Sequence, residues 1–159
     1  MLILVVLSLV AASVLWFTKG ASATPGDSRA ETLSRQYEAV TKAARTETEA
    51  FLTVDYKNMD PLIAKVIAGS AGTFKEQYSR AKVTLKASAQ DAQAMSTGKV
   101  LSVGVGDIDD SDAVVFVAAD SQVSNTSTKG KSQPRYYRFK LTMVRQGDKW
   151  LTSDLQFVN

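Results

Sequence analysis

The chain has 159 residues, of which 45% are hydrophobic and 22% charged, an ordinary globular composition that allows one packed core. It contains no cysteine and no histidine, which excludes disulfides, thiolate zinc sites and every catalytic arrangement built on those residues. The net charge of +3 is too balanced for a nucleic-acid-binding surface. The serines, aspartates and tyrosines show no spacing that pairs a nucleophile with a base. We therefore expect a protein that is not an enzyme, with no metal or cofactor and no nucleic-acid partner.

The first element is an apolar stretch at residues 1–19. Its first 17 residues carry no charge and would form a helix of roughly 25 Å, close to the ~30 Å of bilayer hydrocarbon. Trp16, Phe17 and Lys19 are expected at the membrane interface. We expect a single-pass transmembrane anchor or uncleaved signal, with the C-terminal domain outside the cytoplasm. The alternative is a secreted protein, because small residues near Ala23 are spaced as in a signal-peptide cleavage site.

A short linker and a long helix are expected next. Residues 20–27 are small and polar and contain a Pro-Gly pair, which is typical of a linker, so the folded domain is expected over residues 28–159. Ser28 and Glu31 have the spacing of a capping box. Apolar residues then recur at helical intervals as far as Phe51, which predicts an amphipathic helix of about 25 residues.

Two further helices are predicted from their end signals. Asp60 and Pro61 are expected to supply the N-cap and first turn of a short helix that ends at Gly69. Thr73 and Glu76 repeat the capping-box spacing and are expected to begin a third helix, which fades into an alanine-rich segment.

From Gly98 onward the hydrophobic period changes from helical to two, which predicts strands. The inward face of the first strand is expected to carry Leu101, Val103 and Val105. Residues 113–119 and 137–143 indicate two more strands, and the second of these is expected to bury Tyr137, Phe139, Leu141 and Met143. A tight turn at Gly147 then leads to a fourth strand that pairs with the third as a hairpin. In that last strand Leu151, Leu155 and Phe157 are expected to share one face.

Helices followed by strands indicate an α+β domain with about three helices packed on one face of a curved, four-stranded antiparallel sheet. Two surface features have ordinary explanations within that fold. The acidic segment 107–112 could hold calcium, but it departs from the EF-hand ligand spacing and is better explained as a turn between strands. Arg138 and Lys140 could meet nucleic acid or anionic lipid, but the alternation places them on the solvent face of their strand.

A set of aromatic residues could line an apolar pocket between the sheet and the helices, or could fill the core instead. The candidate pocket residues are Tyr37, Phe74, Tyr78, Tyr137, Phe139 and Trp150.

Two segments resemble the actinobacterial Mce-associated membrane proteins. Residues 135–144 (RYYRFKLTMV) and 147–158 (GDKWLTSDLQFV) are similar to the closing hairpin of that family, and residues 71–78 (AGTFKEQY) to the start of its long inner helix. The resemblance implies a bitopic protein with an NTF2-like cone, similar to the periplasmic domain of VirB8-type secretion scaffolds. It also implies an accessory role in the cell envelope of mycobacteria and their relatives, and it brings no catalytic residue.

On this resemblance we expect a membrane-anchored accessory protein that supports the assembly or stability of an Mce-type lipid uptake system. The expected partners are Mce transporter subunits or other envelope proteins and membrane lipid, with a homo-oligomer as a further possibility. Two alternatives remain open: a carrier domain that binds a lipid or sterol in the cone pocket, and a VirB8-like secretion scaffold.

Overall fold

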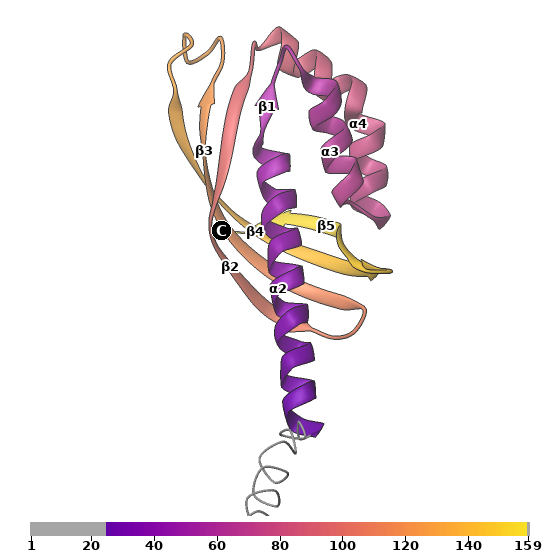
Figure 1. Ribbon diagram of the computed structural model, residues 1–159. Coiled ribbons are helices and arrows are strands. Elements are labelled where there is room, and N and C mark those ends of the chain that lie inside the picture. Colours follow the sequence, from indigo (N-terminus) through magenta and orange to yellow (C-terminus); the bar gives the residue numbers. More distant parts are fainter. Residues whose placement is uncertain (1–24, 159) are drawn as a thin grey trace, which may run out of the picture. The chain divides into compact units, whose positions relative to one another are not determined.

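The computed structural model describes residues 25–158 (Figure 1). The chain divides into two units, residues 1–35 and 36–159, and the described residues of the first unit form the opening turns of helix α2 (Pro25–Leu52). Proline suits the first position of a helix, so the three residues from Pro25 that were expected in the linker are helical.

The expected anchor at residues 1–19, with Trp16, Phe17 and Lys19, lies outside the described residues, as does the expected cleavage position at Ala23. Among the helices within residues 25–158, none is long and apolar enough to cross a membrane.

The second unit is an α+β domain, as predicted, with one more strand than expected. Its strands are β1 (Val54–Asp55), β2 (Met95–Ile108), β3 (Asp112–Ser124), β4 (Gln133–Gln146) and β5 (Lys149–Phe157). They form a five-stranded antiparallel sheet in the order β1-β2-β3-β4-β5. The prediction of four strands is wrong because β1 has only two residues, too few to show an alternation, and it is held by pairing with Met95 and Ser96.

Helices α3 (Met59–Gly69) and α4 (Gly72–Asp91) lie side by side next to α2 (Figure 1). The predicted N-cap at Asp60 is wrong, because α3 begins at Met59 with Asn58 at the N-cap position. Asp60 lies in the first turn, where its carboxylate accepts a hydrogen bond from Lys86 Nζ at 2.6 Å. The predicted capping box at Thr73 and Glu76 is also wrong, because the N-cap position of α4 is Ala71.

The junction of α3 and α4 is held by a local bond from the C-cap residue of α3 and by a tertiary contact with β5. The Ser70 hydroxyl donates to the Val66 carbonyl at 2.7 Å, and Gly72 takes a φ of +49°, which favours glycine. The Ala71 amide donates to the Thr152 carbonyl at 2.8 Å. The junction is therefore tied to β5, a contact that local sequence signals do not encode.

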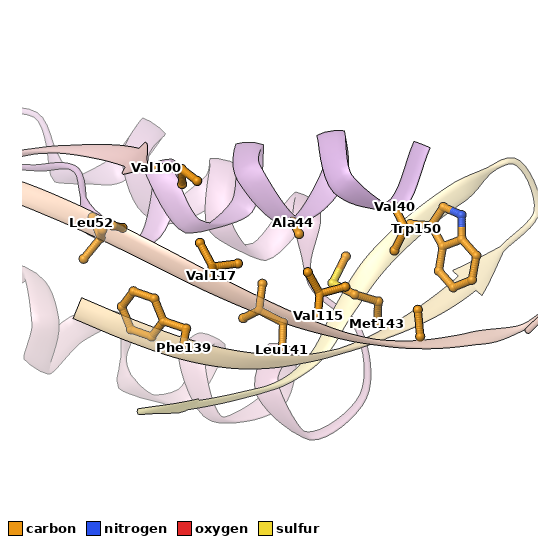
Figure 2. Packing of buried hydrophobic residues seen from close by; sticks show 12 residues of the cluster. Val40, Ala44, Leu52, Val100, Val115, Val117, Phe139, Leu141, Met143 and Trp150 are labelled. Carbon is orange, nitrogen blue, oxygen red and sulfur yellow. The ribbon is translucent and has the colours of Figure 1, made fainter. Parts of the chain in front are cut away.

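The core lies between α2 and the sheet, with side chains from the helix facing β3 and β4 (Figure 2). Its buried residues are Val40, Ala44, Leu52, Val100, Ala113, Val115, Val117, Ala119, Phe139, Leu141, Met143 and Trp150. The predicted stripe on β4 is confirmed, since Phe139, Leu141 and Met143 are fully buried and Tyr137 packs half-buried against them. The predicted hairpin is also confirmed, with β4 and β5 joined through Gly147 at a φ of +60°.

Two β-bulges change the predicted inward faces. In β2 an irregularity between Val100 and Ser102 buries Val100 and leaves Leu101 54% exposed, so the prediction for Leu101 is wrong. A bulge inserts one residue and reverses the side-chain parity of the strand beyond it, so the alternation before it no longer predicts the face.

The second bulge lies in β5, where Thr152 and Asp154 pair with adjacent residues of β4 and Ser153 is the extra residue. Before it Trp150 and Thr152 are buried, and after it the inward residue is Leu155, which pairs with the buried Leu141. The prediction that Leu151 shares this face is therefore wrong.

The close packing of Gly98 in β2 against the Leu52 side chain can be tested by substitution. A methyl group at Gly98 would overlap Leu52 Cβ and lie 3.1 Å from its Cδ1, whereas nothing lies within 4 Å of the same position at Gly104. We expect Gly98→Ala to lower the free energy of unfolding by about 1–3 kcal/mol through overpacking. Gly104→Ala is the matched control, because it makes the same chemical change in the same strand. Urea denaturation of the full chain measures both, and equal midpoints for the two variants would contradict the packing argument.

Candidate functional site

Four of the six candidate pocket residues meet in an aromatic cluster around Phe51 of α2. The Phe51 ring lies 6.1 Å from Phe74, 6.2 Å from Tyr78 and 6.0 Å from Phe139, measured between centroids. Tyr137 stacks on Phe139 at 5.7 Å. These side chains fill space between α2, α4 and the sheet, as aromatic residues of a core do.

The other two candidates lie elsewhere. Tyr37 is an exposed residue of α2, and Trp150 is buried at the start of β5. Trp150 also lines a cavity of about 580 Å³ between α2, the end of α3 and the β4–β5 hairpin. This volume is within the range of small-molecule sites. We take this cavity as the candidate functional site.

Helix geometry explains which α2 side chain turns toward the cavity. Arg45 and Glu49 are one turn apart and both reach the edge of β2: Arg45 Nη1 donates to the Val100 carbonyl at 2.7 Å, and the Val100 amide donates to Glu49 Oε1 at 3.2 Å. A residue midway between them projects from the opposite side of the helix, since each residue turns it by about 100°. That residue is Glu47, which lines the cavity together with Gly69 of α3.

Glu47 is a buried acid whose Oε1 atom has no hydrogen-bond partner among residues 25–158. The residue is 3% exposed, and no donor or acceptor in the described part of the chain reaches its Oε1 atom. The missing side chain of Gly69 makes room for it, because a methyl group there would overlap Glu47 Oε2. A buried polar atom without a partner is costly, so such groups call for a functional or structural explanation.

Burial also changes the protonation of this group. Desolvation raises the pKa of Glu47 from 4.5 to about 8, and the nearby charge of Lys65 opposes this only in part. The pKa of Tyr78 is raised as well, first by its own burial and then by the Glu47 charge. At neutral pH the Glu47 carboxyl is therefore mainly protonated, and it can donate as well as accept a hydrogen bond.

Sequence reasoning did not single out Glu47, although a signal was present. The apolar stripe predicted for this helix steps by four residues from Val40 to Ala44 and then by seven to Phe51. The position skipped, three residues after Ala44, falls on the same buried stripe and holds Glu47. A charged residue at a position that belongs to the buried face of an amphipathic helix indicates a buried titratable group.

The acidic segment 107–112 joins two strands, as expected: it covers the end of β2, a tight connection at residues 109–111 and the first residue of β3. Asp109 Oδ1 accepts hydrogen bonds from the amides of Ser111 at 2.7 Å and Asp112 at 2.8 Å, and these bonds lower the pKa of Asp109. Within residues 25–158, no group of three or more acidic side chains is arranged to hold a metal ion. On β4, Arg138 is exposed beside the buried Phe139, which agrees with a solvent-facing basic side chain.

A family model described as "Uncharacterized protein Rv1363c/MT1408-like" matches residues 1–159. The chain is also 28% identical over 106 residues to the uncharacterized protein Rv1363c of Mycobacterium tuberculosis (strain ATCC 25618 / H37Rv). That alignment covers 67% of this chain and 40% of the relative, so the match spans about two fifths of the longer protein.

Solved structures with a similar fold include two secretion proteins. One is an IcmL-like type IV secretion system protein of Legionella pneumophila, with a TM-score of 0.60, 14% identity, and coverage of 78% of this chain and 91% of that one. Another is CagV of Helicobacter pylori, a VirB8 homologue, with a TM-score of 0.60, 7% identity, and coverage of 77% and 98%. An NTF2-like protein of unknown function from Shewanella oneidensis has a TM-score of 0.51, 10% identity, and coverage of 78% and 99%. These similarities confirm the expected NTF2-like and VirB8-like fold, and at such low identity they show the fold alone.

Proposed function

We propose that this chain, which belongs to the Rv1363c/MT1408-like family of uncharacterized proteins, is a non-catalytic scaffold anchored in the cell membrane. The observation that carries the proposal is the fold shared with the IcmL-like protein and CagV, which covers 91% and 98% of those chains. Both belong to type IV secretion systems by their names. A fold accommodates many functions, so the transfer of a scaffold role is an analogy that experiment must test.

The composition supports a role without catalysis. The chain has neither histidine nor cysteine, the residues most often used as general base and as thiol nucleophile. The buried acid of the candidate site, Glu47, has no hydrogen-bond partner for its Oε1 atom in the described residues, so no neighbouring side chain is positioned to exchange a proton with that atom.

We also propose where the scaffold acts and which transport system it supports. We place the domain outside the cytoplasm, tethered by residues 1–19, where it contacts Mce transporter subunits or other envelope proteins and supports lipid uptake. The apolar N-terminal sequence supports this assignment, as does the resemblance of residues 71–78, 135–144 and 147–158 to Mce-associated proteins.

Photo-crosslinking in living cells tests the partner. A benzoylphenylalanine at Val83 of α4 or at Phe116 of β3 replaces an exposed hydrophobic side chain on each of two elements, so folding should be preserved. We expect an Mce subunit to be captured from at least one position, and a deletion strain to lose Mce protein and lipid uptake. Cells without the crosslinking residue are the control. Capture of secretion-system subunits instead, or unchanged Mce levels in the deletion strain, would refute the assignment.

A further inference from the structure

The walls of the Glu47 cavity are suited to an apolar molecule of modest size. Three alanines of α2 and α3 line the cavity together with Trp150, a largely buried residue of the core cluster. The apolar wall residues are Ala39, Ala43, Ala68, Trp150 and Leu151. An aromatic or short aliphatic body packed there would be removed from water, which is favourable in proportion to the apolar area buried.

The charges around this cavity favour an anion. Lys42 of α2 and Lys149 of β5 are exposed at its rim, and neither forms an ion pair within residues 25–158. Lys65 of α3 is close enough to act electrostatically on Glu47. Asp148 is the one exposed acidic residue among those that line the cavity. Three cationic groups against one anionic group attract a negatively charged ligand.

Glu47 supplies the polar contact inside the cavity. Its carboxyl is buried with Oε1 unsatisfied, and its proton allows it to donate to an anionic acceptor. Hydrogen bonds to charged groups are stronger than those between neutral groups. Once Glu47 ionises, the same position presents a buried negative charge, which repels an anion.

We propose that this cavity binds a small carboxylate with an apolar body, whose carboxylate accepts a hydrogen bond from Glu47 near Lys42 and Lys149 while its body packs against Trp150. This site is separate from the scaffold role proposed above, and neither proposal depends on the other. The charged and titratable groups that face Glu47 are Lys42 on α2, Lys65 on α3, Tyr78 on α4, and Asp148 and Lys149 at the hairpin.

Calorimetric titration with 2-naphthoate tests the site. The full chain is held in lipid nanodiscs, empty nanodiscs serve as the blank, and the probe is ionised at both pH 6.5 and pH 9.5. Because Glu47 has a pKa of about 8, its protonated fraction falls between these values, and we expect binding to weaken by up to about 30-fold. The probe 2-naphthylmethylammonium has the same ring system and is cationic at pH 6.5, and at that pH it is expected not to bind.

Two variants separate Glu47 from other titrating groups. Glu47→Gln keeps a hydrogen-bond donor that does not titrate, so naphthoate should bind with the same affinity at both pH values. Glu38→Gln removes an exposed acid of the same helix and should keep the pH dependence of the unmodified chain. A circular dichroism spectrum and a melting curve of each variant establish that it is folded.

Three results would overturn the proposal. The first is no saturable naphthoate binding at millimolar concentration to the folded, unmodified chain. The second is a pH dependence that persists unchanged in folded Glu47→Gln. The third is tighter binding of the ammonium probe than of naphthoate, which would show that the cavity selects cations.

Discussion

Phe139→Ala is expected to lower the free energy of unfolding by about 3–5 kcal/mol. Phe139 is fully buried in the middle of β4, and its ring contacts Phe51 of α2 edge-on at 6.0 Å and Phe157 of β5 at 5.0 Å. Truncation would remove one of the contacts between α2 and the sheet and would leave a cavity that the surrounding strands cannot close.

An exposed aromatic residue of the same strand, Tyr136, provides the control. Tyr136 is 77% exposed on the opposite face of the strand, so Tyr136→Ala should change the free energy of unfolding by less than about 0.5 kcal/mol. Chemical denaturation of both variants in the full chain measures the difference. If Phe139→Ala unfolded at the same denaturant concentration as Tyr136→Ala, the core assigned to this strand would be wrong.

Stability is expected to fall as pH rises from about 5 to about 9 because of Glu47. Its pKa is about 8 in the folded protein and 4.5 for an ordinary glutamate, so between these values the folded state holds a proton that the unfolded state has lost. Folding is then coupled to proton uptake, and the free energy of unfolding decreases by about 1.4 kcal/mol per pH unit. Over the whole window the loss is on the order of 4 kcal/mol.

The contribution of this one carboxyl is isolated by comparison with Glu47→Gln. The amide does not titrate, so the variant should lack this decrease and should be more stable than the unmodified chain at pH 9, while the two should be similar at pH 5. Glu38→Gln, which changes an exposed residue, should retain the decrease. Parallel pH profiles for the unmodified chain and Glu47→Gln would show that Glu47 titrates normally.

The sequence predicted most of the regular elements because their patterns are local. The alternation from Tyr137 to Met143 and the glycine turn at Gly147 place β4 and β5 correctly, since an antiparallel strand with one solvated face needs only a period of two. The succession of helices and strands likewise predicted the α+β class.

The candidate site could be predicted only in part. Trp150 was selected for its size and apolar character, and it lines the cavity. Glu47 was overlooked because glutamate in a helix is usually solvated, and its burial depends on α3, whose Gly69 leaves room for the carboxyl. The charges of Lys42 and Lys149 are separated by more than a hundred residues in the sequence and meet only at this cavity.

The sequence by itself determined the period, polarity and order of the elements, together with the absence of histidine and cysteine chemistry. Only the tertiary structure decided the strand faces at the bulges at Leu101 and Ser153, the first residues of α3 and α4, and the burial of Glu47. Periodicity arises within a few consecutive residues, whereas a bulge, a helix junction or a buried charge is stabilised by groups far along the chain. These long-range contacts turn an ordinary glutamate into the protonated acid at the centre of the candidate site.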